Sequence, residues 1–261
     1  MTGFPGFGVL LKRLAEHHEL RAGDISSLSA VPESELQAVF GGAAPSPSLL
    51  CSLAPVFHLH AEDLFVIADV AQPLEMSPLD PHAGTMVAVL AWHAAHLGSQ
   101  DRNRLLRFAA SLPQEDRTKP ASEPRAYLQY PPGPGSLLMR LLANRNPGWL
   151  AGAQTFLPLT GRYWSAAAYG QVGHGRKQLT PDLLADYATV LGMRADDLAV
   201  LTGVDLADDA PPPSRVSSDV AELIWEARRL TRDQVRQLRD LAKAALPTQL
   251  PTEIPASGRG H

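Results

Sequence analysis

The hydrophobic positions of this chain recur mostly at helical spacing. Over residues 7–20 the apolar side chains fall three or four positions apart, while Lys12 and Arg13 occupy the opposite face. Shorter runs of the same kind follow, with Pro32 at a favoured first-turn position and Gly41-Gly42 after a helix end. Alternating β-branched runs are almost absent, so the expected fold class is all-α. The predicted helices cover residues 7–20, 24–30, 32–40, 47–57, 61–68, 84–97, 99–112, 218–230 and 232–246.

The same pattern occurs twice along the chain. Residues 46–70, SPSLLCSLAPVFHLHAEDLFVIADV, return at 180–204 as TPDLLADYATVLGMRADDLAVLTGV. Upstream, the run GVLLKRL that begins at Gly8 corresponds to the run GSLLMRL that begins at Gly135. A repeat of this length predicts two similar domains in one polypeptide, which together form a covalent pseudo-dimer.

The repeat divides the 261 residues into six segments. We expect a five-helix first unit, a connector with an amphipathic helical pair, a Pro-rich linker, a five-helix second unit, a second connector with a helical pair, and a disordered tail. They cover residues 1–70, 71–112, 113–134, 135–204, 205–246 and 247–261. Six prolines in the linker favour extended, weakly packed chain. The pairs carry Trp92 and Trp225 as expected core anchors, and we expect them to dock on their own units or on each other.

Composition excludes several classes of protein. Hydrophobic residues make up 45% of the chain and aromatic residues 6%, which suffices for helical cores of Leu, Ala and Val. No run of about 18 apolar residues is present, and the N-terminus lacks the regions of an export signal. A cytoplasmic protein with no membrane partner is therefore expected. The single cysteine, Cys51, excludes an intrachain disulfide and is expected to be buried.

The order of these signals resembles the five-helix helix-turn-helix domain of Cro- and lambda-repressor-like transcriptional regulators. In the first unit the resemblance rests on Leu20, Ile25, Ala30, Val31, Pro32, Leu36, Val39, Phe40, Gly41, Gly42, Pro47, Leu50, Leu53, Ala54, Glu62, Asp63 and Leu64. That unit departs from the family because Ala30 stands where the turn would carry glycine, and Phe40 stands where glutamate is frequent. The second unit matches best at GHGRKQLTPDLL, residues 173–184, after a seven-residue expansion. The resemblance implies two tandem, partly degenerate helix-turn-helix domains.

The resemblance also implies that the second helix of each motif enters the major groove and that basic loop residues hold phosphates. Residues 1–70 contain three basic and eight acidic residues, with Glu33 and Glu35 on the groove-facing helix, whereas residues 133–204 contain six basic and four acidic residues. Residues 145–178 contain no carboxylate. We therefore expect the second unit to contact double-stranded DNA. The expected contacts are Arg145, Gln154, Arg162, Ser165, Ala166, Ala167, Gln171, His174, Arg176 and Lys177, with Ser165 as the cap of the recognition helix.

The expected function is that of a sequence-specific DNA-binding transcriptional regulator, bacterial and nucleoid-associated. The acidic first unit would then serve packing, homodimerisation or a protein partner. The alternative is a protein-interaction adaptor that uses helix-turn-helix folds without binding DNA, because fold alone does not establish function.

No enzyme, cofactor or metal site is expected. Nucleophile-elbow, P-loop and dinucleotide motifs are missing from the sequence. The histidine pairs His58/His60 and His93/His96 lack acidic or cysteine partners at ligand spacing, and the second pair fits an exposed helix face. The aromatic residues of the expanded region, Trp149, Tyr163 and Trp164, are expected to pack inside the unit instead of stacking on sugar-phosphate.

Overall fold

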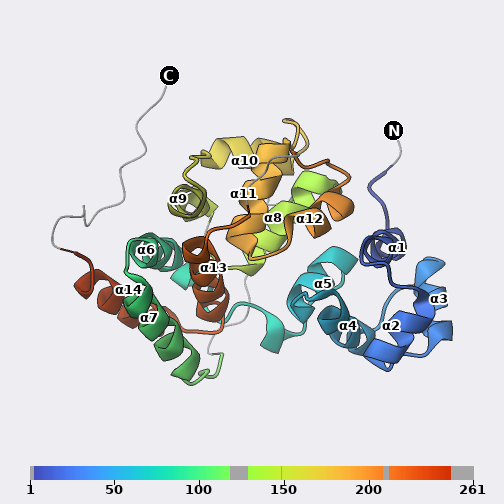
Figure 1. The fold of residues 1–261 in the computed structure, drawn as a ribbon, viewed down its shortest axis with the longest axis horizontal. Helices are drawn as coiled ribbons and strands as arrows, with labels where there is room; N and C mark the ends of the chain where they lie inside the picture. The colour runs from blue at the N-terminus through green and yellow to red at the C-terminus, as the bar shows by residue number, and fades with distance from the viewer. Residues whose placement is uncertain (1–2, 118–128, 148, 208–211, 248–261) are drawn as a thin grey trace.

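The computed structural model describes residues 3–117, 129–147, 149–207 and 212–247. Within these ranges the regular elements are helices and none is a strand, which confirms the all-α fold class (Figure 1). The middle of the Pro-rich linker and the expected tail beyond residue 247 lie outside the described residues. In the described part, no single helix is long and apolar enough to cross a bilayer, although the bent pair Pro47–Phe57 and Ala61–Ala68 passes that test by length and composition alone.

The first unit contains five helices at the predicted places. A serine cap starts the fourth one, since the Ser46 hydroxyl accepts the N–H of Leu49 at 3.2 Å and Pro47 follows it. Cys51 on that helix is half-buried. The helices are α1 (Phe7–His17), α2 (Ala22–Ser29), α3 (Glu33–Phe40), α4 (Pro47–Leu53) with its 3-10 extension η1 (Ala54–Phe57), and α5 (Ala61–Ala68).

The second unit repeats this order as α8 (Pro134–Asn144), α9 (Trp149–Thr160), α10 (Ala166–Gly173), α11 (Pro181–Leu191) and α12 (Ala195–Thr202). The lengths locate the seven-residue expansion. Helix α9 has 12 residues against 8 in α2, the next turn has five (161–165) against three (30–32), and the loop after α10 has seven (174–180) against six (41–46). The other helices of the two units match in length.

Backbone turns also recur at equivalent places. Among the described residues each unit has five with positive φ, namely Glu19, Ala30, Gly42, His58 and Asp69 in the first and Asn146, Gly161, Gly175, Gly192 and Gly203 in the second. Ala30, at φ 58°, and Gly161, at φ 71°, make the same left-handed turn in the two units. Glycine adopts this conformation without steric cost. A side chain in that conformation costs about 1–2 kcal/mol. The first unit thus keeps the geometry of its turn despite losing the favoured residue.

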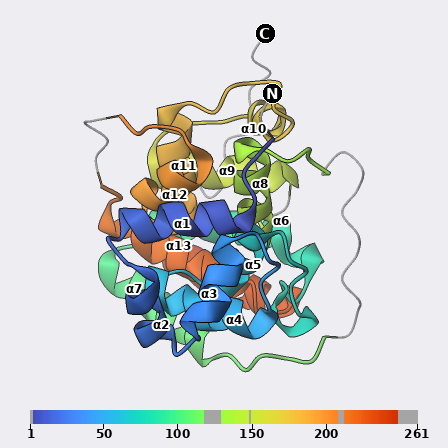
Figure 2. The same ribbon diagram turned by 90° about the vertical axis from the view of Figure 1, so that its right-hand side faces the viewer.

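The two units pack against each other through their first and fifth helices. Helix α1 lies against α12, and its counterpart α8 lies against α5, as Figures 1 and 2 show. The same helices of each unit therefore meet in reciprocal fashion, which is the arrangement of a two-fold symmetric dimer. The chain is a pseudo-dimer in structure as well as in sequence.

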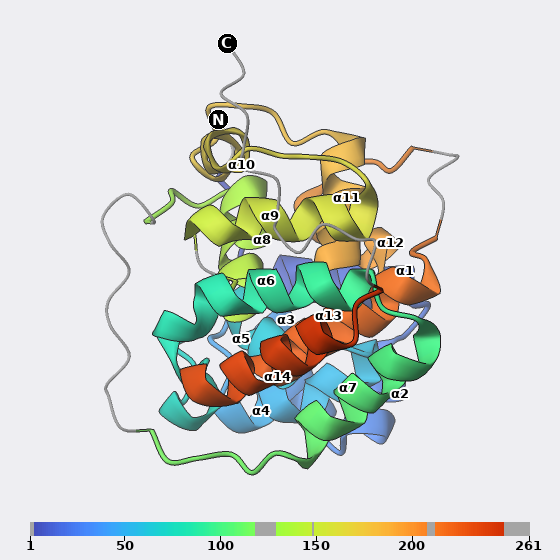
Figure 3. The same cartoon turned by 90° about the vertical axis from the view of Figure 1, so that its left-hand side faces the viewer.

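The first connector contains the 3-10 turns η2 (Leu74–Met76) and η3 (Pro81–Ala83). The helical pairs are α6 (Gly84–Ala95) with α7 (Ser99–Ser111), and α13 (Arg215–Ala227) with α14 (Arg232–Ala244). The pairs pack on each other, α6 against α13 and α14, and α7 against the same two helices (Figure 3). Helix α6 also lies along α9, so the first pair docks on the second unit. Trp92 is buried as expected, whereas His93, expected on an exposed face, is 2% exposed because α6 has neighbours on several sides.

A buried polar cluster joins both units and the second helical pair. Asn144 Nδ2 donates to Asp63 Oδ1 at 2.9 Å, Arg145 forms an ion pair with the same carboxylate, and Arg145 Nη2 donates to the carbonyl of Leu191 at 2.6 Å. From α13, Arg228 forms an ion pair with Glu62 at 2.9 Å. Asp63 and Arg145 are 0% and 1% exposed, so the cluster is part of the core of the molecule.

Candidate nucleic-acid interface

Helices α9 and α10 occupy the part of the second unit that was predicted to be the helix-turn-helix motif. Helix α9 ends at Thr160, Gly161 provides the positive-φ turn, and Ser165 precedes α10. The Ser165 hydroxyl accepts the N–H of Ala168 at 3.1 Å, which confirms the predicted helix cap. Tyr169 and Val172 are buried against α8 and α9, so they fix which face of α10 turns outward.

The outward face of α10 carries small and uncharged side chains. Ala167 and Gln171 are exposed and lie one helical turn apart, while Ser165 and Ala166 are half-buried. In all three views α10 lies at the outer edge of the second unit (Figures 1 to 3). Among the described helices, α10 packs mainly against α8 and α9, and Ala167 and Gln171 are exposed on its other face.

The loop that follows α10 carries the cations. Arg176 and Lys177 are both exposed. Among the described residues Arg176 has no side-chain partner, and Lys177 Nζ lies 5.8 Å from the ring centre of Trp164. Neither cation is neutralised by a carboxylate at ion-pair distance in the described part of the chain, so both charges are available to an anion.

Arg145 was wrongly predicted to contact DNA. Its side chain is buried between the units, where it pairs with Asp63 and lies 4.6 Å from the ring centre of Trp225. A guanidinium in that position cannot reach a ligand outside the molecule. The sequence pattern identified a donor in a carboxylate-free stretch, but the carboxylate that binds it comes from the other unit.

Arg162 is exposed in part, yet its charge is already compensated. It forms ion pairs with Asp182 at 2.9 Å and with Asp186 at 3.0 Å, both on α11. Trp164 Nε1 also donates to Asp186, at 2.5 Å. Burial raises the pKa of Asp186, and the hydrogen bonds from Trp164 and Arg162 partly oppose this effect. Arg162 therefore contributes less free positive charge to the surface than the sequence suggested.

The other predicted contacts are less accessible. Gln154 on α9 is half-buried, and so is His174, whose ring packs against that of Tyr130 at 4.7 Å between centres. Trp164 is half-buried, in agreement with the packing role expected for it, whereas Tyr163 is 50% exposed and does not pack inside the unit. The side chain of Trp149 lies outside the described residues. Of the predicted set, Ala167, Gln171, Arg176 and Lys177 are exposed without being engaged in an ion pair among the described residues.

The first unit presents a different surface at the equivalent helix. Glu33, Ser34 and Glu35 begin α3 where Ala166, Ala167 and Ala168 begin α10, and all three side chains are exposed. Carboxylates stabilise a helix N-terminus but repel a phosphate there. The two units therefore differ in surface charge at this helix, although their folds correspond helix by helix.

Comparison with protein-family models, with curated proteins and with solved structures finds no significant match to this chain.

Proposed function

We propose that the protein is a sequence-specific DNA-binding transcriptional regulator, acting in the bacterial nucleoid, in which the second unit contacts the DNA. The observation that carries the proposal is the exposed, carboxylate-free face of α10 next to the uncompensated cation Arg176. A recognition helix of this kind reads base edges from its N-terminal part while neighbouring basic residues hold phosphates.

Each accessible residue has a role that follows from its chemistry. The small side chain of Ala167 lets α10 approach the floor of the major groove and touch a thymine methyl group. Gln171 is suited to a bidentate contact with adenine. Arg176 and Lys177 supply charge to the sugar-phosphate backbone, which carries affinity but no sequence information.

A protein-interaction adaptor is the second candidate, and the first unit favours it. The acidic start of α3 and the side chain of Leu28 on α2, which is 65% exposed, form a surface suited to a basic protein and unsuited to DNA. In our proposal the first unit serves as the partner-binding or packing half of the regulator. An adaptor without DNA binding would show no affinity for duplex DNA in the experiments below.

The double substitution Arg176→Ala with Lys177→Ala is expected to weaken binding to all duplex sequences alike. Loss of two phosphate contacts should reduce the slope of log affinity against log salt concentration by about two. Fluorescence anisotropy titrations over a range of salt concentrations measure both quantities. Arg21→Ala, which removes an exposed cation of the first unit, is the matched control and should leave both unchanged. An unaltered salt slope in the double variant would contradict the proposal.

Gln171→Ala is expected to change sequence preference without changing nonspecific affinity. A good base contact is worth about 1–3 kcal/mol of discrimination, so the preference at one or two base pairs should flatten. Selection of preferred sites from random duplex DNA compares the variant with the wild type. Gln37→Ala, an exposed glutamine on α3, should reproduce the wild-type motif. Identical motifs from wild type and Gln171→Ala would mean that α10 does not read bases.

A further inference from the structure

The reciprocal packing of the two units creates two equivalent polar clusters. One lies where α8 meets α5 and contains the buried pair of Asp63 and Arg145 described above. The other lies where α1 meets α12 and contains His17 and His18 at the end of α1 and Asp196 and Asp197 in the first turn of α12. The equivalent clusters have carboxylates in common but differ in the groups that face them.

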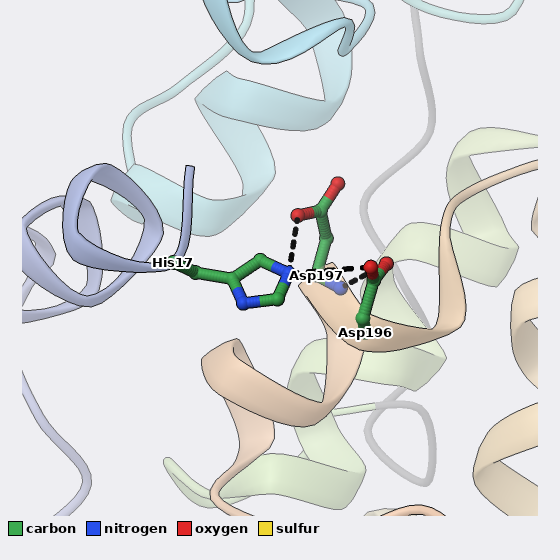
Figure 4. Close-up of side chains that lie close together, drawn as sticks. All are labelled: His17, Asp196 and Asp197. Carbon is green, nitrogen blue, oxygen red and sulfur yellow. Dashed lines mark hydrogen bonds and ion pairs between the residues drawn. The ribbon is translucent and has the colours of Figure 1, made fainter. Parts of the chain in front are cut away.

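The two histidines converge on the two carboxylates. Figure 4 shows the imidazole of His17 pointing between Asp196 and Asp197. His17 Nε2 lies 3.3 Å from Asp196 Oδ2 and 3.9 Å from Asp197 Oδ1, and His18 Nε2 lies 2.7 Å from Asp197 Oδ1. The ligand atoms of His17 and the two aspartates all lie within 4.8 Å of one another.

The cluster is partly enclosed and has an access route. The side chains of Asp197 and His18 are 1% and 11% exposed, whereas those of His17 and Asp196 are 30% and 38% exposed. Asp197 and the His18 that contacts it are thus held by packing between the units, and His17 and Asp196 face solvent.

Charge compensation differs between the equivalent clusters. At α5 and α8, Glu62 and Asp63 are matched by two guanidinium groups, those of Arg228 and Arg145. At α1 and α12, Asp196 and Asp197 face one guanidinium, that of Arg194, and two imidazoles that carry no charge when they are unprotonated. Two carboxylates against one guanidinium leave an excess of one negative charge.

We propose that His17, Asp196 and Asp197 bind a divalent transition-metal ion, with Zn²⁺ as the first choice, while His18 holds Asp197 in place through its contact of 2.7 Å. Neutral imidazoles and carboxylates form a ligand set that Zn²⁺ accepts, at about 2.0–2.2 Å from the metal. Tetrahedral bonds of that length place ligand atoms roughly 3.3 Å apart, and the separation of His17 Nε2 from Asp196 Oδ2 is 3.3 Å. The bound ion would connect α1 of the first unit to α12 of the second.

Arg194 competes with the ion for the same carboxylates. It forms an ion pair with Asp196, and its Nε lies 3.8 Å from Asp197 Oδ2. The hydrogen bond from Arg194 holds the pKa of Asp196 well below its usual range. The Arg194 side chain is 57% exposed and can move into solvent when a metal ion takes its place.

Titration of the full-length, tag-free protein with Zn²⁺ by isothermal titration calorimetry, and with Co²⁺ by visible absorption, tests the proposal. We expect one ion per chain and a Co²⁺ spectrum of four-coordinate type. Saturating Zn²⁺ should raise the melting temperature by about 3–8 °C, because the ion binds the folded arrangement of both units.

Two variants and one control make the test specific. His17→Ala should weaken Zn²⁺ binding by at least about tenfold, since it removes a direct ligand, and Arg194→Ala should tighten binding, since it removes the competing cation. His58→Ala removes an exposed histidine outside the cluster and should behave as wild type. Absence of binding at millimolar Zn²⁺, equal affinity in wild type and His17→Ala, or weaker binding in Arg194→Ala would each overturn the proposal.

Discussion

Replacement of Arg145 by methionine is expected to lower the free energy of unfolding by about 3–5 kcal/mol, because it leaves a buried carboxylate without its cation. Asp63 is 0% exposed, and in the variant the amide of Asn144, 2.9 Å away, would be its remaining donor among the described side chains. The substitution also removes the hydrogen bond from Arg145 to the carbonyl of Leu191, which links α8 to α11. The damage therefore falls both on the contact between the two units and on the packing of α8 within the second unit.

Equilibrium unfolding in urea, followed by far-ultraviolet circular dichroism, measures the change. Arg21→Met is the matched control, because Arg21 pairs with Asp24 at 3.2 Å on the surface and such pairs contribute about 0–1 kcal/mol. The double variant Asp63→Leu with Arg145→Met should recover most of the loss, since apolar groups often replace a buried ion pair without cost. A loss below about 1 kcal/mol in the single variant would show that the pair does not hold the units together.

Local structure was largely predictable from the sequence. Helix starts follow from side chains that cap them, as at Ser46 and Ser165. Positions of turns follow from the repeat, and Ala30 shows that even a degenerate position keeps its left-handed conformation when the surrounding helices require it. These features depend on residues that are close in the sequence, where spacing and propensity act directly.

Interactions between distant residues were not predictable in the same way. Arg145 and Arg162 both lie in a stretch without carboxylates, yet each forms an ion pair with an aspartate on another helix. His17 meets Asp196 across 179 positions of chain, a contact that depends on how the two units pack. A charge count along the sequence treats these groups as free, whereas packing decides which of them pair and which face solvent.

The alanine variants Gly8→Ala and Gly135→Ala are each expected to destabilise the protein by about 1–3 kcal/mol, through overpacking at equivalent helix contacts. A Cβ atom on Gly8 would lie 2.2 Å from the carbonyl oxygen of Val39, and one on Gly135 would lie 2.1 Å from that of Val172. Both obstacles are backbone atoms at the ends of α3 and α10, so a side-chain rotation cannot relieve them. The first helix of each unit must therefore move away from the third.

Gly23→Ala provides a close control for both variants. Gly23, Gly8 and Gly135 are each the second residue of a helix, but a Cβ atom on Gly23 would meet its nearest neighbour, Glu33 Oε2, at 4.0 Å. Alanine is favoured over glycine in helices, so Gly23→Ala should gain up to about 1 kcal/mol. Thermal and urea unfolding of the three variants measure the contrast. A gain in stability for Gly135→Ala equal to that for Gly23→Ala would mean that α8 and α10 do not approach each other this closely in solution.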